Sequence, residues 1–476
     1  MKRLLLILLC SLILSTTATA QNDDEILAKI NDSPLTIKDL DFQTRQSIEG
    51  LPRLIEDLRK RELQNEINKL LFESEAKTQK ISVSKLLETN VLSRVSSPSA
   101  QQVEAVYQAN QASFEGKTFE QAKSRIINYL RRESENQLSN DYAEKLKNTH
   151  KVVIGVDVND LNLKPNDVLA TIDAQTLTVE RFNERLRPLE YNLSFDVYQQ
   201  KQASVDNTIF SNLIFLEAKK RGVQPENIIQ QEVTEKVKTP TEIEAKKFFD
   251  EQKPKPKVAF ESAKTEVINF LEQRQIQNLQ IALRDKLLRE NKIQVLLKQP
   301  EPPILNIKFD ANAPSKGNKA AKVTVVMFTD FQCSACAQTH PIVQEVLRKY
   351  NDRARLIVRD FPLTEVHENA FIAAEAAQAA HAQGKFFEYT DILYKNQNAL
   401  DIASLKKYAA QIGLSPQRFA SDLSGGKYAA AIRQSRLDGE FYGINSTPTI
   451  FVNGVKVLIA KPQDLQNAIE KALAKK

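Results

Sequence analysis

Two cysteines three positions apart are the residues of this 476-residue sequence whose types and spacing point most plainly to chemistry. They are Cys333 and Cys336, in the stretch FTDFQCSACAQTHP, which follows an apolar run and precedes a pattern typical of a helix. Such a pair can exchange a disulfide with another protein, form half of a zinc site or close a small structural disulfide. The residues around the pair and the rest of the chain distinguish these hypotheses.

The elements expected around the pair would make the two thiols chemically unequal. Residues 322–328, KVTVVMF, are apolar and β-branched, which predicts a buried strand, and a helix is expected after the turn. Cys333 would stand at the start of that helix, where unpaired backbone N–H groups and the positive end of the helix dipole favour a thiolate. Cys336 would lie one turn further along and be more buried. The pattern therefore predicts Cys333 as the attacking thiol and Cys336 as the resolving thiol.

A zinc site and an inert disulfide are the alternatives. A structural zinc site usually needs four Cys or His ligands. His340 follows Cys336 by four residues and could share its helix face, but no second pair with suitable spacing accompanies them. A three-residue spacing closes too small a loop for much entropic stabilisation. Disulfide exchange without a metal or other cofactor is therefore favoured, with His340 and His367 as packing or polar surface residues and Asp330 as a turn or cap residue.

The first twenty residues have the features of a secretory signal peptide. Two basic residues precede the apolar run 4–14, and ATA before Gln21 is typical of a cleavage site. The run is short against the about 20 residues of a membrane-spanning helix, so cleavage is favoured over an uncleaved anchor. Cleavage would remove Cys10 and leave Cys333 and Cys336 as the cysteines of a periplasmic chain, where thiols can be oxidised.

The charge balance does not indicate a nucleic-acid partner. The chain has 66 Lys and Arg against 60 Asp and Glu, a formal net charge of +6. The two signs are mixed along the sequence, without a basic block or aromatic residues interleaved with basic ones. We therefore expect no binding of nucleic acid.

Glycine and proline divide the chain into two halves. Only four of the twelve glycines precede residue 300, which favours helices in front and turns and strands behind. Between the halves, the stretch KQPEPPILN cannot continue a helix and favours an extended linker, for which we take residues 299–313. The back half, residues 314–476, is expected to be a separate domain.

The front half contains an internal duplication. The stretch ILAKINDSPLTIKDLDF from Ile26 recurs as VLATIDAQTLTVERFNE from Val168, and FEQAKSRIINYL recurs as FESAKTEVINFL 141 residues later. The copies are taken as residues 21–160 and 165–298. Each is expected to open with a small hairpin, continue in long helices and close on a short strand that pairs with its own hairpin.

The repeated blocks resemble the helical, non-catalytic portion of SurA-like periplasmic chaperones and parvulin-type foldases, present twice over about residues 24–298. The hairpin followed by LT and a helix, the helix starts SPSAQQVEAVYQAN and KTPTEIEAKKFFDEQ, and the FEQAK and FESAK helices carry the resemblance. It implies polypeptide binding or scaffolding. Such foldases commonly carry an inserted prolyl isomerase domain, but the few residues before Phe119 and Phe260 leave no room for one, so isomerisation is not expected.

The back half resembles the thioredoxin fold, and most closely the DsbA-like family, over roughly residues 304–476. The Cys-x-x-Cys after a first strand, STPTIFVNG before a terminal hairpin, RDFPL and the helical stretch AFIAAEAAQAAHAQGKFFEYTDILYKNQ carry the resemblance. It implies that Cys333 is the nucleophile and Cys336 the resolving cysteine. It also implies that Thr447 and Pro448 form the cis-proline pair that faces the disulfide and hydrogen-bonds a bound peptide.

Two departures from the DsbA-like pattern predict a milder redox centre. The dipeptide between the cysteines, Ser334 and Ala335, lacks the histidine that helps to make the best-known oxidant of the family so oxidising. Met327 stands at a strand position where many relatives carry an acidic proton relay. We therefore expect slower or less oxidising exchange.

Together these patterns predict a multidomain chain. A mainly α N-terminal half, two repeats of a hairpin plus helices, would precede an α/β thioredoxin-fold domain with a helical insertion. The predicted function is that of an exported protein disulfide oxidoreductase, an oxidase or isomerase, with a chaperone-like arm that binds clients. Its partners would be unfolded or cysteine-containing proteins and a redox partner, soluble or in the membrane. The alternative is a periplasmic chaperone or assembly factor whose thioredoxin fold is a docking platform.

Overall fold

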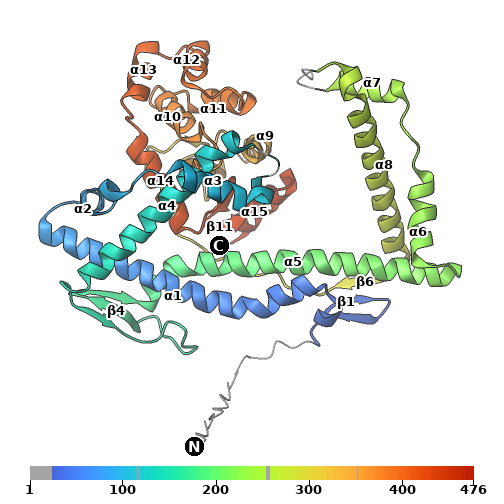
Figure 1. The fold of residues 1–476 in the computed structure, drawn as a ribbon, viewed down its shortest axis with the longest axis horizontal. Helices are drawn as coiled ribbons and strands as arrows, with labels where there is room; N and C mark the ends of the chain where they lie inside the picture. Colours follow the sequence, from blue (N-terminus) through green and yellow to red (C-terminus); the bar gives the residue numbers. More distant parts are fainter. Residues whose placement is uncertain (1–23, 115, 117, 253–257, 351, 476) are drawn as a thin grey trace, which may run out of the picture. The chain divides into compact units, whose positions relative to one another are not determined.

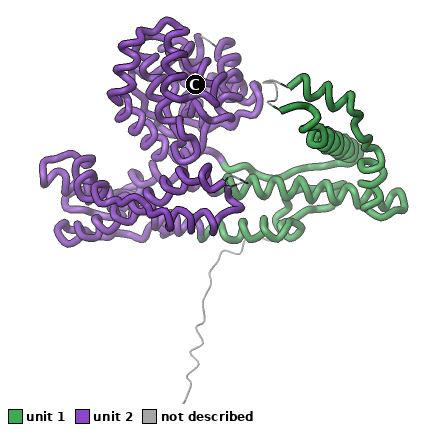
Figure 2. Tube along the Cα trace, turned by 45° about the horizontal axis from the view of Figure 1, so that its top comes forward, with its two compact units in different colours: residues 1–53, 194–300 green, residues 54–193, 301–476 purple. Residues whose placement is uncertain are grey.

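The structure is a computed structural model that describes residues 24–114, 116, 118–252, 258–350 and 352–475. The predicted signal peptide, residues 1–20, lies outside the described residues. The chain divides into two compact units, one of residues 1–53 and 194–300 and the other of residues 54–193 and 301–476 (Figure 2). In the part of the chain that is described, no helix is long and apolar enough to cross a membrane. The predicted domain limits stay predictions.

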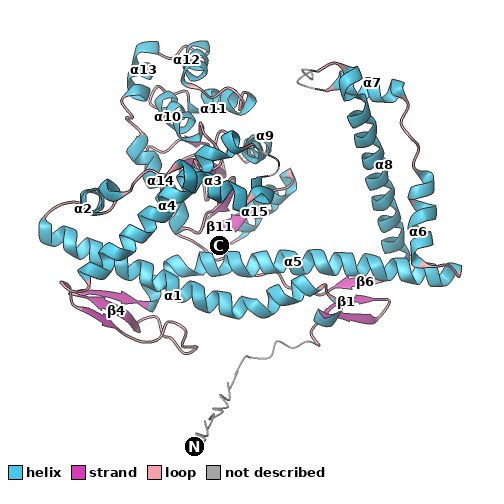
Figure 3. Cartoon of the chain, viewed as in Figure 1, coloured by secondary structure: helices cyan, strands magenta, loops and turns pink. Residues whose placement is uncertain are grey.

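The β-strands and α-helices of the two copies of the duplicated front half follow the same order (Figures 1 and 3). The first copy consists of β1 (Ile26–Ile30), β2 (Ser33–Thr36), η1 (Ile37–Asp39), α1 (Phe42–Gln79), α2 (Val83–Asn90), η2 (Leu92–Arg94), α3 (Ala100–Ala109), η3 (Gln111–Phe114), α4 (Phe119–Leu146) and β3 (Val152–Ile154). The second consists of β4 (Val168–Ile172), β5 (Gln175–Thr178), α5 (Val179–Arg221), α6 (Pro225–Glu232), η4 (Thr234–Lys236), α7 (Glu242–Glu251), α8 (Phe260–Glu290) and β6 (Ile293–Val295).

Local capping explains why corresponding helices of the two copies begin where they do. At the start of α3, the Ser99 hydroxyl accepts from the backbone N–H of Gln102, whose side chain accepts from the Ser99 N–H. At the start of α7, Thr241 and Glu244 make the same reciprocal pair. Each capping box satisfies N–H groups that a helix end leaves unpaired.

The closing strands pair with the opposite copy's hairpin, so the prediction that each copy pairs with its own hairpin was wrong. The closing strand of the second copy, β6, joins β1 and β2, with Ile30 opposite Ile293. The closing strand of the first copy, β3, joins β4 and β5, with Val152 opposite Ile172. The reason lies in α1 and α5, which have 38 and 43 residues and are therefore about 57 and 65 Å long. Each carries the rest of its copy far from its own hairpin.

The apolar cores of the front half follow this exchange. One core combines the β1–β2 hairpin with α5, α6 and α8, for example Leu27 with Leu213 and Leu287. The other combines the C-terminal part of α1 with β4, β5 and the start of α5, for example Leu70 with Phe182. Because each core takes side chains from both copies, one copy alone would leave its apolar faces exposed.

The back half contains a five-stranded sheet and a run of helices between its two halves (Figure 3). Its elements are β7 (Ser315–Lys316), β8 (Val323–Thr329), α9 (Ser334–Lys349), β9 (Ala354–Asp360), α10 (Ala370–His381), α11 (Phe386–Lys395), α12 (Ile402–Gln411), α13 (Pro416–Ser424), α14 (Ala429–Phe441), β10 (Thr449–Val452), β11 (Val455–Val457) and α15 (Pro462–Ala474). The strand order is β11-β10-β8-β9-β7, with β8 and β9 parallel and β10 antiparallel to β8. The predicted fold class, with helices inserted between β9 and β10, is confirmed.

Alternate residues of β8 face different cores, which decides what surrounds the cysteines. Val325 and Met327 belong to the core that contains Cys336, whereas Val326 and Phe328 belong to the core on the other face of the sheet. Because side chains alternate along a strand, Thr329 lies on the same face as Met327.

Candidate functional site

The cysteine pair lies where a central strand of the sheet is followed by a helix. The strand β8 ends at Thr329, and α9 begins at Ser334 with Cys333 as its N-cap residue. Cys333 has 8 % of its surface exposed and Cys336 has 2 %, and both are free thiols. The resolving position is therefore the more deeply buried, as the sequence pattern predicts.

The surroundings shift the pKa values of the two thiols in opposite directions. The Cys336 side chain hydrogen-bonds to Cys333, and the backbone N–H groups of Ala335 and Cys336 add to this, so the pKa of Cys333 falls to about 5 although burial opposes the change. Burial raises the pKa of Cys336 well above its usual value, and the neighbouring Cys333 sulfur raises it further. At neutral pH the reduced site therefore holds a thiolate at Cys333 and a thiol at Cys336.

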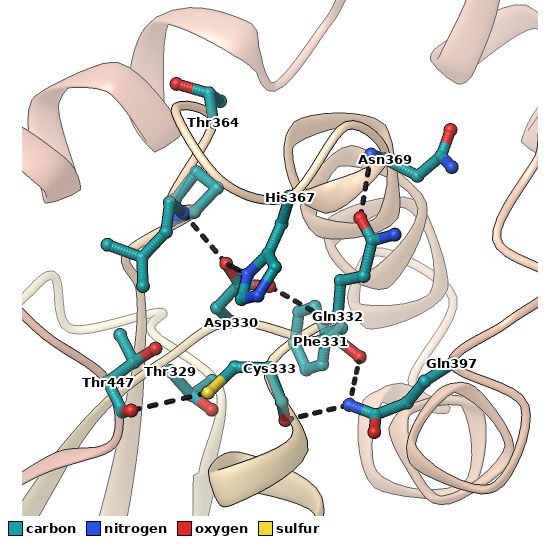
Figure 4. Close-up of polar contacts among 12 residues, drawn as sticks. Thr329, Asp330, Phe331, Gln332, Cys333, Thr364, His367, Asn369, Gln397 and Thr447 are labelled. Atoms are coloured by element: carbon teal, nitrogen blue, oxygen red, sulfur yellow. Dashed lines mark hydrogen bonds and ion pairs between the residues drawn. The ribbon is translucent and has the colours of Figure 1, made fainter. Parts of the chain in front are cut away.

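The loop before β10 brings Thr447 and Pro448 to the same place. The peptide bond between these residues is cis. The Thr447 carbonyl accepts a hydrogen bond from Cys333 Sγ at 3.3 Å (Figure 4). All four residues that the sequence singled out thus lie at one site, although Thr447 and Cys333 are 114 residues apart. Their roles in catalysis and substrate binding stay predictions.

Asp330 anchors the turn between β8 and α9. Its side chain accepts from the backbone N–H of Gln332 at 2.7 Å, as expected of a turn residue. It also accepts from the backbone N–H of Leu363 at 2.8 Å and lies 2.8 Å from Nδ1 of His367 (Figure 4). Asp330 thus ties the cysteine turn to the segment after β9, and no local pattern in the sequence predicts its pairing with His367.

Two glutamines, also missed, hold the same turn from the helical insertion. The side-chain amide of Gln397, just after α11, donates to the carbonyls of Phe331 at 3.0 Å and Cys333 at 2.8 Å (Figure 4). Gln332 Oε1 accepts from the backbone N–H of Asn369 at 2.8 Å. These contacts link residues 37 to 66 positions apart, and no local pattern in the sequence signals them.

His340 is turned toward an acidic partner. Its Nε2 lies 2.6 Å from Asp391 Oδ1, and Gln344 contacts both groups. The imidazole ring also contacts the Tyr394 ring, with 4.5 Å between ring centroids and an angle of 40° between the ring planes. Across the described ranges, no group of three or more His, Cys, Asp or Glu side chains is arranged to hold a metal ion.

A known family model matches most of the back half. Residues 311–471 match the family model described as Thioredoxin. This part of the chain has the thioredoxin fold. The matched segment is about a third of the sequence, and the cysteine turn and the cis-proline loop both lie within it.

Several known proteins are similar to about a third of the chain. The Na(+)/H(+) antiporter NhaA 3 of Salinispora tropica is 41% identical over 139 residues, which is 29% of this chain and 21% of that protein. The chain thus spans about a fifth of that relative's length. A thioredoxin-like oxidoreductase from Silicibacter pomeroyi has 29% identity and a TM-score of 0.33, covering 35% of this chain and 95% of that one. Oxidised BdbD from Bacillus subtilis has 20% identity and a TM-score of 0.32, covering 36% and 96%.

Proposed function

We propose that the protein is an exported thiol-disulfide oxidoreductase that exchanges disulfides with cysteine-containing proteins. The observation that carries the proposal is the inequality of the two thiols: Cys333, a helix N-cap with a pKa of about 5, beside Cys336, which burial keeps protonated. A low pKa makes Cys333 both an attacking thiolate and a good leaving group at neutral pH. A thiol that only packed in a core would have its pKa raised by burial.

The exchange proceeds through a mixed disulfide. In the oxidising direction, a client thiolate attacks Cys333 of the Cys333–Cys336 disulfide, and Cys336 leaves with the electron pair and takes up a proton. A second client thiolate then attacks the client sulfur that is bound to Cys333, and the Cys333 sulfur leaves as a thiolate. The client gains a disulfide, and the site gains two electrons in its two thiols. The reverse sequence reduces a client disulfide, and neither direction needs a metal or an organic cofactor.

Thr447 and Pro448 are proposed to bind the client's backbone beside the reacting sulfur. The Thr447 carbonyl accepts a hydrogen bond from Cys333 Sγ when this sulfur is a protonated thiol. When Cys333 is a thiolate or part of a disulfide, its sulfur has no proton to donate, and this carbonyl is free to accept from a backbone N–H of the client.

The helical half is proposed to act as a client-binding arm, defined as residues 24–298. The resemblance to SurA-like chaperones suggests this role, and large exposed apolar side chains on α5, α7 and α8 support it. These are Phe215, Ile243, Phe270 and Ile281, with exposed fractions of 58, 82, 52 and 56%. Exposed apolar residues suit contact with unfolded polypeptides, in which apolar side chains are accessible.

Turnover of the mature protein tests the proposal. Residues 21–476 should catalyse insulin reduction by dithiothreitol and oxidation of a dithiol peptide, and Cys333→Ala should abolish both activities. Cys336→Ala is the matched variant: it keeps the attacking thiol, so it should accumulate client adducts at Cys333 on non-reducing gels. Turnover that persists in Cys333→Ala would contradict the proposal. Absence of turnover in the unaltered protein would favour a chaperone whose thioredoxin fold is a docking platform.

A further inference from the structure

The strand β3, which closes the first copy of the arm, leaves one edge of its sheet open. The strand order is β3-β4-β5, so β3 is an outer strand of the sheet labelled β4 in Figure 1. No strand of the described residues pairs with its outer edge. An outer strand presents backbone N–H and C=O groups that can pair with another chain, so this edge is a candidate binding surface.

The hydrogen bonds at the two ends of β3 show which backbone groups point outward. The Lys151 carbonyl accepts from the turn between β4 and β5 at 2.8 Å, and the Gly155 N–H donates to a carbonyl of β4 at 2.9 Å. In an antiparallel pair, residues that bond to the neighbouring strand alternate with residues that do not. Val152 and Ile154 therefore turn their N–H and C=O groups away from β4 and toward the open edge.

The side chains along this edge are apolar and exposed. Val153, Ile154 and Val156 have 48, 60 and 40% of their surface exposed. Other outer strands of the arm are protected differently: β2 contains Pro34, which cannot donate to a further strand, and β5 is mostly polar. The three residues of β3 are too few for a lasting pair, which suits a partner that binds briefly.

A cavity of about 430 Å³ lies between β3 and α1. Its apolar lining consists of Leu63, Ile67, Ile154, Val156 and Val158. Lys60 and Asp157, which have opposite charges, also line it, so the cavity has no excess of either sign. An uncharged, apolar side chain is therefore the group that fits it.

A strand added to β3 would direct its side chains into this cavity. Val152 packs against the core beneath the sheet, and Ile154, two positions later, lies on the same face. In an antiparallel pair, residues directly opposite each other have their side chains on the same face. The residue that exchanges both hydrogen bonds with Ile154 would therefore place its side chain on the cavity side, and its neighbours would point to the other face.

The small size of the surface favours a flexible segment over a second folded copy of the chain. Stable interfaces between folded proteins bury about 1,200 to 2,000 Å². A strand of three residues with one cavity beside it cannot supply this area. An extended segment of an unfolded protein can bind here briefly, because its backbone supplies the hydrogen bonds and its alternate side chains fill the cavity.

We propose that the open edge of β3 binds extended segments of client proteins by adding them as a further strand. This inference rests on the proposed client-binding arm and names its recognition site. The backbone pairing does not depend on the client's sequence, whereas the cavity selects clients with apolar side chains at every second position. Unfolded chains of many proteins contain such segments, because strands with one buried face have this pattern.

A peptide without cysteine, Lys-Thr-Val-Thr-Val-Thr-Val-Thr-Lys, tests the proposal on residues 21–476 in the disulfide form. Deuterium exchange of the amides of Val152 and Ile154 is measured by mass spectrometry. With the peptide at ten times its Kd, these amides should exchange about tenfold more slowly, because about a tenth of the sites stay free. The peptide N-methylated at its valines should give no protection, since it lacks the N–H groups on the edge that puts valine in the cavity. The peptide N-methylated at its three inner threonines should protect as before.

Variants of the protein give the matching test. Ile154→Pro removes one outward N–H at an edge position, where proline is tolerated, and should weaken binding about fivefold or more, with the Val152 amide as the readout. Thr176→Pro is the control on the opposite edge of the sheet. Thr176 is opposite Thr171, which bonds toward β3, so its own N–H points away from β4. This control should bind the peptide as the unaltered protein does.

A second variant covers a failure of folding. If Ile154→Pro does not fold by circular dichroism, Ile154→Lys decides the question, because it changes an exposed side chain and keeps the backbone groups. It should weaken binding about tenfold by removing the apolar side chain from the cavity.

The outcomes are distinguishable. Equal protection by the two N-methylated peptides, or binding by the Ile154 variants as tight as by Thr176→Pro, would overturn strand addition. Protection of Val152 that rises with protein concentration in the absence of peptide would show that a second copy occupies the edge, and would also overturn it. If the unaltered protein suppresses aggregation of an unfolded client but the peptide does not protect β3, this inference fails and the client-binding arm stands. If neither occurs, both fail.

Discussion

At the level of single residues, the proposed chemistry depends on two cysteines three positions apart at the start of α9. Cys333, at the N-cap, is close to the backbone N–H groups that stabilise a negative charge, and Cys336, one turn later, is buried under the sheet. The side-chain amide of Gln397 donates a hydrogen bond to the backbone carbonyl of Cys333, and this contact limits how the turn can move. The same backbone geometry therefore activates one sulfur and keeps the other protonated.

Alkylation of the reduced protein tests this inequality. The rate of Cys333 labelling by iodoacetamide should be half its maximum near pH 5, because the thiolate is the reacting form and the pKa of Cys333 is about 5. Cys336 should label slowly up to pH 9, because burial raises its pKa. Peptide mass spectrometry after timed labelling measures both rates. Faster labelling of Cys336 than of Cys333 at pH 6 would reverse the assigned roles.

The low pKa of Cys333 also predicts how the stability of the reduced protein depends on pH. The folded pKa lies below the unfolded value of about 8.5, so the stabilisation is complete above that value and is lost as the pH falls through about 5. Urea unfolding of the reduced protein between pH 5 and 9 measures it. Reduced Cys333→Ala should lose this part of the pH dependence, and an unchanged slope in that variant would contradict the assignment.

At the level of elements, the exchanged strands make the two copies of the arm depend on each other. Each three-stranded sheet contains a hairpin from one copy and a closing strand from the other. His150, at the end of the first copy, strengthens this arrangement. Its Nε2 lies 2.8 Å from Glu75 of α1, and its Nδ1 lies 2.7 Å from Asp173 in the turn of the second copy's hairpin.

Separated copies should not fold. Residues 21–160 and residues 165–298, each produced alone, should be unfolded or aggregated. Each fragment lacks the strand or hairpin of the other copy that completes its sheet, and it lacks the side chains that the other copy contributes to both apolar cores. Produced together, they should form a one-to-one complex with the helical circular dichroism of residues 21–298. Size-exclusion chromatography and thermal unfolding measure this. A cooperative, monomeric fold of either copy by itself would show that the exchanged pairing is not required.

The stability of the arm should depend on pH through His150. Burial by itself would lower the pKa of His150, but its hydrogen bonds to Glu75 and Asp173 outweigh burial and raise it. The stabilisation is therefore complete below the unfolded pKa of about 6.5 and is lost as the pH rises through the raised folded value. The pKa values of Glu75 and Asp173 are lowered, so their contribution is lost only as the pH falls below about 4.

Urea unfolding of residues 21–298 between pH 5 and 8.5 tests this dependence. His150 is the only histidine of that fragment, so no other side chain with an ordinary pKa titrates in this range. His150→Gln should cost about 2 kcal/mol at pH 5.5 and abolish the decline of stability at higher pH. A decline of the same size in the variant would show that another group causes it.

At the level of the whole molecule, the chain joins a thioredoxin-fold domain to a longer helical arm. The arm contributes to both compact units, because α1 and α5 each continue from one unit into the other. A continuous helix cannot unfold at its middle without losing several backbone hydrogen bonds.

Removing the arm should affect large clients selectively. Residues 299–476 should oxidise a short dithiol peptide within about twofold of the full mature chain, because the peptide needs only the cysteine site. Oxidation of a large unfolded protein should slow about tenfold or more, because the tether no longer raises the client's concentration near Cys333. Stopped-flow oxidation of both substrates measures this.

The control is residues 21–298 added as a separate chain. It should suppress aggregation of the client but not restore its oxidation rate, since local concentration requires the covalent link. It should also not accelerate prolyl isomerisation of a client. Equal rates for both substrates with and without the arm would show that the repeats serve another purpose, such as dimerisation.

The features that could be predicted from the sequence alone depend on residues that are close together in the chain. The inequality of Cys333 and Cys336 follows from a strand, a turn and a helix start within a few residues, and the capping boxes at Ser99 and Thr241 follow from side chains three positions apart. These interactions form wherever the segment folds, so their pattern can be recognised without knowing the rest of the chain. The resemblance to the DsbA-like family extended this to Thr447 and Pro448.

The tertiary structure decided what depends on partners far apart in the chain. The two hairpins are so similar in sequence that the sequence does not show whether a closing strand pairs with its own copy's hairpin or with the other copy's. The lengths of α1 and α5 decide this, because they set how far each closing strand lies from its own hairpin. Likewise, no local pattern signals that Gln397 holds the cysteine turn, because its contacts with the Phe331 and Cys333 carbonyls join positions 66 and 64 residues apart. Sheet register and helix reach are properties of the packed chain, because they are selected by the burial of whole apolar faces and not by neighbouring residues.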